Sequence, residues 1–210
     1  DGVLAATHTW NRSYPLTKIP EIDSINSVKR NIEQTNKEQS VVTVAFYGAA
    51  LGQADQTGLD LISEALSDMG SRLFSRIREE LGLAYYVGAQ NFSGIGTGCF
   101  TFYAGTGADS AKQVEEELIA QAKTLSLEGL TKEELHRAKA KLLGQRKIAR
   151  QELGSVAFNA CMDELLGLGF NHSIDEEERI KNITLDQVLD VSGRFFSINN
   201  YAVAISTPSS

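Results

Sequence analysis

The sequence contains little of what a local metal site would require. Its 210 residues include only 3 histidines, 2 cysteines and 3 prolines. The histidines, His8, His136 and His172, lie far apart, and no H-x-x-E-H, H-x-x-H or C-x-x-C motif is present. A local zinc site needs two ligands on one face of a helix or turn. The sequence therefore predicts no metal in this chain, and we interpret the three histidines as surface residues.

Nucleophilic catalysis and a disulfide framework lack support as well. Cys99 falls in a strand-like run, and Cys161 falls on an apolar helical stripe. Single cysteines in such places behave as small hydrophobic residues, so we expect both to be buried. Cys161 has no base nearby in the sequence, and there is no G-x-S-x-G elbow. The cysteines leave the compartment undetermined.

Basic charge and long apolar runs are also lacking. The chain has 27 acidic and 20 basic residues, which gives a formal net charge of -7. Nucleic-acid binding depends on clusters of Lys and Arg, and no apolar run approaches the length of a membrane span. We therefore expect neither nucleic acid nor a membrane among the partners.

The composition is that of a globular domain, with 42% hydrophobic and 22% charged residues. A chain of this length can bury a substantial core. Residues 1–27 are mostly polar and contain Pro15 and Pro20, and we interpret them as an irregular lead-in segment. Residues 28–210 are predicted to form a single domain.

Strand and helix signals follow one another in an order that indicates the fold class. Period-two and β-branched patterns predict strands over residues 27–34, 40–47, 83–92, 97–104 and 201–206. Helical spacing predicts helices over residues 58–69, 71–81, 110–128, 132–149, 155–168 and 185–195. Thr131 with Glu134, and Thr184 with Gln187, form capping boxes, and Asp109 is expected to cap the third helix. This order favours an α+β two-layer sandwich, a mostly antiparallel sheet with helices on one face.

One segment, over residues 70–90 (GSRLFSRIREELGLAYYVGAQ), combines a cation and a phenol at close spacing. Arg78 falls in the last turn of a predicted helix, Gly82 reverses the chain, and Tyr85 begins the next strand. A guanidinium and a phenol can both donate hydrogen bonds to a peptide carbonyl or a developing oxyanion. An Arg in a last turn also opposes the helix dipole, so spacing alone leaves a purely structural role open.

The same segment resembles the C-terminal-type domain of the pitrilysin family, which includes mitochondrial processing peptidase and insulin-degrading enzyme. The resemblance rests on residues 70–74 (GSRLF), on Arg78 and on residues 82–85 (GLAY). It implies the mitochondrial-processing-peptidase-like metallohydrolase fold, in which two related halves enclose a chamber. It also implies that one half holds zinc and that the other supplies an Arg and a Tyr to the substrate. The matching substrate-binding positions here are Arg78 and Tyr85.

The resemblance also sets the expected partners and cofactor. Because the zinc motif has no match, the chain is expected to hold no cofactor and to be inactive alone. The zinc would belong to a homologous partner half, in the same polypeptide or on a separate subunit, and the ligand would be a peptide or protein substrate. The alternative is a non-catalytic structural or assembly subunit, because the family includes scaffolds of that kind.

Overall fold

The computed structural model describes residues 25–209, in which five strands form one sheet. Residues 1–24 of the predicted lead-in segment, His8 included, lie outside the described part. The strands, in chain order, are β1 (Lys29–Thr35), β2 (Ser40–Gly48), β3 (Ala84–Ser93), β4 (Gly98–Thr106) and β5 (Ala202–Pro208). Their order across the sheet is β1-β5-β2-β4-β3, and every neighbouring pair is antiparallel except β1 with β5. The mostly antiparallel α+β fold is therefore confirmed.

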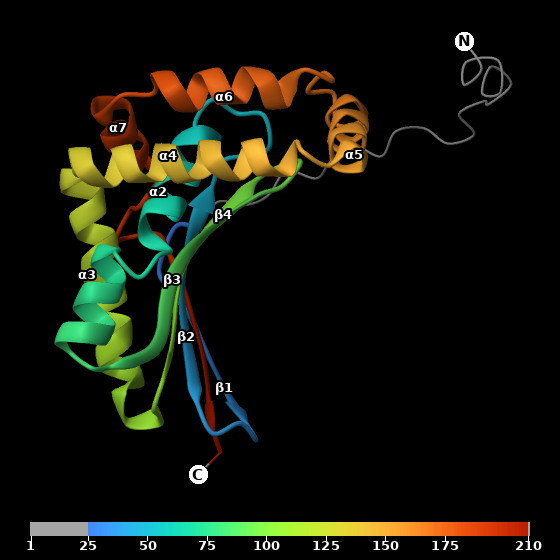
Figure 1. Cartoon of the computed structure of the whole chain (residues 1–210). Coiled ribbons are helices and arrows are strands. Elements are labelled where there is room, and N and C mark those ends of the chain that lie inside the picture. The colour runs from blue at the N-terminus through green and yellow to red at the C-terminus, as the bar shows by residue number, and fades with distance from the viewer. Residues whose placement is uncertain (1–24, 210) are drawn as a thin grey trace, which may run out of the picture.

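Helices cover one face of this sheet and leave the other face bare (Figure 1). They are α2 (Gln56–Leu66), α3 (Ala111–Glu128), α4 (Lys132–Ala149), α5 (Leu153–Leu165), α6 (His172–Asn182) and α7 (Leu185–Phe195). A π-helical segment, η1 (Phe74–Glu80), and a short 3-10 turn, η2 (Ala108–Ser110), complete the described helices. None of the helices within residues 25–209 has both the length and the apolar character needed to cross a membrane.

The core lies between the sheet and the helices. Along β2 and β4, alternate residues are buried, as expected when one face of a sheet is covered. The rings of Phe46, Phe100, Phe102 and Phe196 meet there with centroids 4.8–5.9 Å apart, mostly edge to face. Such aromatic pairs add stability beyond the area that they bury. This cluster fixes the covered face and leaves the bare face for other contacts.

The helix starts were predicted with mixed success. Both capping boxes are confirmed: Thr131 accepts from the Glu134 N–H and Thr184 from the Gln187 N–H, with reciprocal bonds in each case. The prediction that Asp109 caps α3 is wrong. Asp109 lies inside η2, and the residue that precedes α3 is Ser110, which makes no side-chain capping bond. The extra 3-10 turn moves the start of the helix past the expected cap.

Two further predictions on the helical side are wrong. His172 does not lie in a loop but is the first residue of α6. Only Glu176 and Ile180 of this helix are buried, so its sequence shows a weak apolar pattern. Cys161 is exposed instead of buried, and Cys99 is half-buried; both are free thiols. The apolar stripe that suggested burial of Cys161 is real, but no residue of α5 is buried within the described structure.

Candidate functional site

The segment that contains Arg78 is anchored firmly at its beginning. The buried Ser71 accepts from the Phe74 N–H at 3.2 Å, and Arg72 donates to Glu134 Oε1 at 2.7 Å and to its second oxygen. Burial by itself would raise the pKa of Glu134, but hydrogen bonds from Arg72 and Thr131 hold it below the ordinary value. These contacts fasten the start of η1 to the start of α4, so the SRLF motif has a structural role.

The helix then widens into π-helical geometry. The Leu81 N–H donates to the carbonyl of Arg76, five residues earlier, and the Leu83 N–H donates to that of Ile77. Ile77 is fully buried, whereas Arg78 and the two residues after it are exposed. Sequence periodicity of 3.6 residues did not predict this geometry. Wide turns of this kind are frequent at functional sites, and here the turn keeps the end of η1 at the surface.

Arg78 differs from nearly all other arginines of the domain. Arg72 is paired with Glu134, and Arg76 with Glu80 and Glu117. Arg78 instead stacks over the Phe74 ring, 4.8 Å from its centroid. Among the arginines of residues 25–209, only Arg78 and Arg179 have no carboxylate within 4 Å. The remaining arginines each form an ion pair: Arg30, Arg137, Arg146, Arg150 and Arg194. The donors of Arg78 are therefore available to a ligand.

Tyr85 occupies a β-bulge at the start of β3. Ala84 pairs with Thr106 and Tyr86 pairs with Gly105, so Tyr85 is the extra residue. A bulge redirects side chains and is frequent next to functional sites. Ala84 is buried, and Tyr85 is 58% exposed. Because η1 lies beside the start of β3 at one edge of the sheet (Figure 1), the two predicted residues lie on consecutive, adjacent elements, and both are exposed.

The edge of β3 is sealed along one part and free along another. Ser63 and Ser67 of α2 donate to the outward carbonyl of Ala89, and Ser63 accepts from the Asn91 N–H. In an antiparallel edge strand, alternate residues direct both backbone groups outward, so Val87 also faces outward. No described residue bonds to the outward N–H and C=O of Val87. The free part of the edge thus begins two residues after Tyr85.

Two further tyrosines lie on the bare face next to this edge. The Tyr86 ring covers the Gly105 backbone so closely that a Cβ there would lie 2.2 Å from a ring carbon. In the same way, a Cβ added to Gly88 would lie 2.8 Å from the Tyr103 hydroxyl. The ring centroids of Tyr86 and Tyr103 are 6.3 Å apart. Sequence reasoning gave neither tyrosine a role. Their role follows from the pairing of β3 with β4, in which Gly88 lies opposite Tyr103 and Gly105 lies opposite Tyr86. The bulge at Tyr85 shifts this register, so the pairing could not be predicted from strand alternation.

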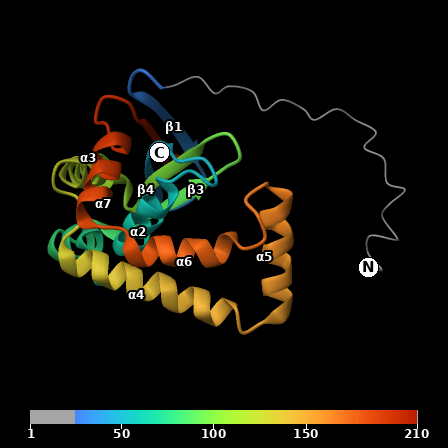
Figure 2. The ribbon, with the colours of Figure 1, turned by 90° about the horizontal axis from the view of Figure 1, so that it is seen from above.

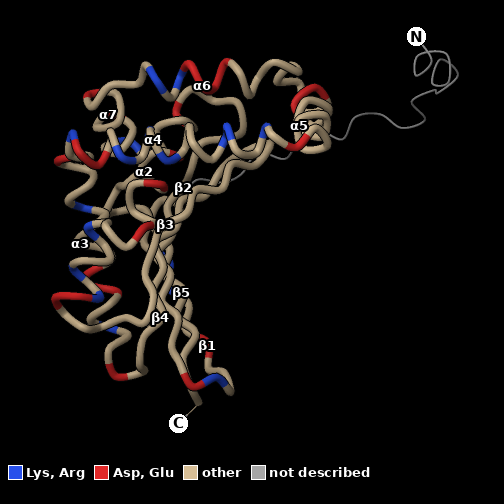
Figure 3. Tube along the Cα trace, viewed as in Figure 1, with Lys and Arg blue, Asp and Glu red and all other residues tan. Residues whose placement is uncertain are grey.

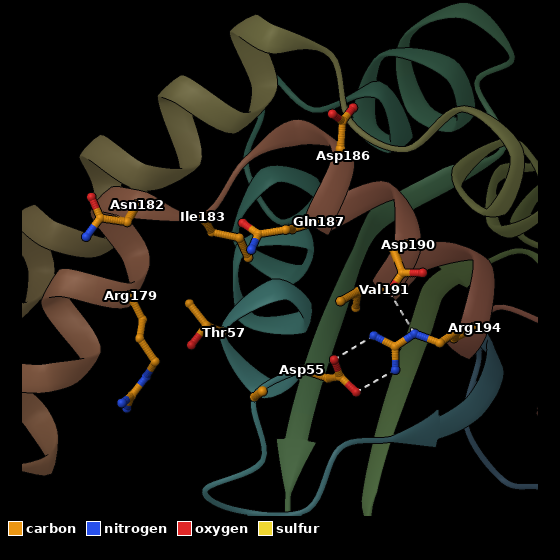
Figure 4. A pocket seen from close by; sticks show the side chains of 11 residues that line it. Asp55, Thr57, Arg179, Asn182, Ile183, Asp186, Gln187, Asp190, Val191 and Arg194 are labelled. Atoms are coloured by element: carbon orange, nitrogen blue, oxygen red, sulfur yellow. Dashed lines mark hydrogen bonds and ion pairs between the residues drawn. The ribbon is translucent and has the colours of Figure 1, made fainter.

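A separate pocket lies between the start of α2 and helices α6 and α7 (Figure 4). Its volume is about 610 Å³, and its strongest charges bind each other: Arg194 donates two bonds of 2.6 Å to Asp55. The hydrogen bonds from Arg194 lower the pKa of Asp55, and those from Asp55 raise the pKa of Arg194. Arg179 points away from this pair. Neither Arg78 nor Tyr85 lines the pocket, so it does not belong to the predicted site.

The described residues do not suit a metal ion. Within residues 25–209, no three side chains of His, Cys, Asp or Glu gather in a group that could hold one. Charged residues lie mainly on the helices, and the strands have few (Figure 3). The bare face of the sheet and the adjoining edge therefore offer hydrogen-bond donors, aromatic rings and free backbone groups.

Comparison with known proteins agrees with this description. The family model described as the peptidase M16 inactive domain matches residues 9–142. The uncharacterized zinc protease YmxG of Bacillus subtilis is 30% identical over 174 residues, which cover 82% of this chain and 42% of that protein. A peptidase M16 inactive domain from Pseudomonas fluorescens has a similar fold, with a TM-score of 0.83 at 19% identity, over 93% of this chain and 46% of that one. A protease from Helicobacter pylori gives 0.84 at 18% identity, over 95% and 48%. The chain thus spans less than half the length of these relatives.

Proposed function

The chain belongs to the peptidase M16 family of zinc peptidases as an inactive, C-terminal-type domain, and from that premise we propose that it binds peptide substrate for a zinc-bearing half. Zinc-dependent peptide hydrolysis requires the metal, an activated water and a general base. The described residues of this chain offer no set of ligands for the metal. They offer donors for the substrate instead, which is a complementary task.

The proposal depends most on one observation: Arg78, exposed and without a carboxylate partner within residues 25–209, lies on η1, and the exposed Tyr85 lies on the adjacent strand β3. A guanidinium presents several N–H donors in a fixed plane, and a phenol adds one O–H donor. Donors of this kind stabilise a substrate carbonyl, and more strongly the oxyanion that forms from it. Arg78 and Tyr85 would then act on the substrate backbone from the side opposite the zinc.

The free part of the β3 edge gives the substrate a place to lie. An extended peptide can add to a sheet as an extra strand, held by main-chain hydrogen bonds. Within residues 25–209 the outward groups of Val87 have no partner, whereas the Ala89 carbonyl and the Asn91 N–H are bonded to serines of α2. A peptide that pairs with Val87 would pass next to Tyr85. We propose this short stretch of edge as the track for the substrate main chain.

Substitution in the complete enzyme, meaning this chain together with its zinc-bearing half, tests the proposal. Arg78→Ala is expected to lower kcat/KM for a fluorogenic quenched peptide by roughly 100-fold or more, the usual loss for an oxyanion donor, and Tyr85→Phe by roughly 10-fold. Both residues are exposed, so the Tm should not change. Arg179→Ala is the matched control, because Arg179 also lacks a carboxylate partner but lies on the helical side. If Arg78→Ala and Arg179→Ala had equal kcat/KM, Arg78 would have no such role.

The alternative role as an assembly subunit has a simple discriminator. An H-x-x-E-H motif within about one domain length of this chain, or on a protein that co-purifies with it, supports the peptidase. Relatives described as zinc proteases favour the peptidase over the assembly subunit.

A further inference from the structure

One side of α5 is apolar and exposed along its whole length. Residues four positions apart lie on the same side of a helix, and such a row runs from Leu153 to Leu165. Leu153, Phe158 and Leu165 are 83%, 65% and 78% exposed. Phe170, just after the helix, closes a shallow hollow of about 500 Å³ beside Leu165. The α5 surface consists of Leu153, Ala157, Phe158, Cys161, Leu165 and Phe170.

No other part of the described chain covers the α5 surface. The helix crosses the ends of α4 and α6 and extends beyond them, as both views show (Figures 1 and 2), and it packs mainly against α6. An isolated helix of this length is marginal in water, and a contiguous exposed apolar patch marks an interaction site. The α5 surface therefore indicates a partner.

The relatives suggest what that partner is. This chain spans 42% of YmxG and 46% and 48% of the two similar solved chains. Each of these proteins thus contains a further stretch about as long as this chain. A stretch of that length is enough for a second domain with its own core.

The position of α5 agrees with a partner that also faces the bare side of the sheet. The β3–β4 hairpin lies beside α5 in both views (Figures 1 and 2), and its residues Phe92 and Ile95 are exposed and apolar. Leu168, which follows α5, packs against Gly52, and the neighbouring Leu51 N–H donates to the hairpin carbonyl of Gly94. The hairpin and the segment after α5 therefore both contact the loop at residues 51–52.

The distances permit one partner to reach both ends of the sheet. Tyr85 is at the start of β3 and the hairpin is at its end, and the ten residues of β3 span roughly 33 Å. A domain of about 200 residues has a radius of gyration of roughly 16 Å and is therefore wide enough to cover that span. We propose that the α5 surface is the docking site of the zinc-bearing half, an inference that rests on the proposed function and adds a specific contact surface to it.

Cys161 is a built-in probe, because its free thiol lies within the α5 surface and is exposed in this chain. The reaction of Cys161 with a maleimide, followed peptide by peptide by mass spectrometry, should be at least tenfold slower in the complete enzyme than in the 210-residue chain. Leu127→Cys provides the reference, since Leu127 is 67% exposed on α3, away from α5. Its thiol should react at the same rate in both proteins. Equal rates for Cys161 in the two proteins would overturn the inference.

A second copy of this chain is the competing occupant, and dilution separates the two. Protection of Cys161 in the 210-residue chain at high concentration, lost on dilution, would assign the surface to a homodimer and overturn the inference. As a second variant, Phe158→Glu with Leu165→Glu should leave the Tm of the 210-residue chain unchanged, because both residues are exposed there. In the complete enzyme the same pair should restore labelling of Cys161, whereas Leu127→Glu should not.

The outcome does not depend on catalysis. If Cys161 is protected while Arg78→Ala leaves kcat/KM unchanged, the docking surface stands and the substrate-binding role fails. If Arg78→Ala lowers kcat/KM while Cys161 reacts freely, the substrate-binding role stands and the docking surface fails.

Discussion

The two faces of the sheet differ in the kind of residue that they present. On the covered face, buried phenylalanines of the strands pack against one another and against Phe196. On the bare face, Tyr86 and Tyr103 lie over glycines, and the strands have few charges (Figure 3). The covered face accounts for stability. The bare face and its β3 edge offer what a peptide or a partner domain can use.

Within one segment the same contrast separates two arginines. Arg72 is held by Glu134 and the Gly129 carbonyl and joins η1 to α4. Arg78, six residues later, has no carboxylate partner within residues 25–209. A paired arginine of this kind fixes the backbone, and an unpaired one at the surface is free to bind. Resemblance in sequence alone does not distinguish these two roles, whereas the contacts do.

The largest expected effect is on the covered face. Phe102→Ala removes a fully buried ring that contacts three other aromatic rings, and should lower the free energy of unfolding by about 3–5 kcal/mol. Thr101→Ala, one position along β4 on the bare face, should change it by less than about 0.5 kcal/mol. Urea denaturation of the two variants measures the difference. Similar losses for both would contradict the distinction between the faces.

On the bare face we expect a smaller effect from Gly105→Ala. The new Cβ would lie 2.2 Å from the Tyr86 ring, so the ring must move, at a cost of about 1–2 kcal/mol. Gly107→Ala is the matched control, because nothing lies within 4 Å of its added Cβ. Chemical denaturation should show a loss only for Gly105→Ala. A loss for both, or for neither, would mean that the Tyr86 ring is not fixed on Gly105.

The smallest effect concerns Asp60, on the helical side. Burial raises the pKa of Asp60. The hydrogen bond from Asn91 (2.8 Å) and the positive charge of Arg146 lower this pKa in part, and the negative charge of Glu176 raises it further. The pKa of this carboxyl is near 3.8 in the unfolded chain and higher in the folded one. The folded state therefore loses stability relative to the unfolded state as the pH rises from the unfolded pKa through the folded pKa. Asp60→Asn should therefore raise the Tm at neutral pH by about 2 °C, or roughly 0.5–1 kcal/mol. The gain should vanish below pH 4; a gain that persists there would contradict the assignment.

The sequence predicted those parts of the fold that depend on local signals. The strand over residues 40–47, the hairpin after Phe92 and both capping boxes required only alternation, turn residues and side-chain chemistry. The parallel pairing of β1 with β5 depends on residues far apart in the chain. The helix α6 was missed because only two of its residues are buried. The exposure of Cys161 could not be predicted, since an apolar stripe does not reveal which partner covers it.

The candidate site was predicted through resemblance, not through spacing. Residue patterns placed Arg78 near Tyr85 but left a structural role open for both. The bulge at Tyr85 shifts the register of β3, and the π-helical turn shifts that of η1, so neither side chain follows the periodicity of its own element. The sealing of the β3 edge by Ser63 and Ser67 is a tertiary contact with no local signal.

A double-mutant cycle on Arg78 and Tyr85 tests most directly whether the two side chains act on one substrate group. The measurement is kcat/KM of the complete enzyme with Arg78→Ala, Tyr85→Phe and both together, on one quenched peptide. The effects of two residues that act on one group are not additive. We therefore expect the loss of kcat/KM in the double variant to be at least 10-fold smaller than the product of the two single losses. A double loss equal to that product, or single variants as active as the wild type, would contradict a shared role.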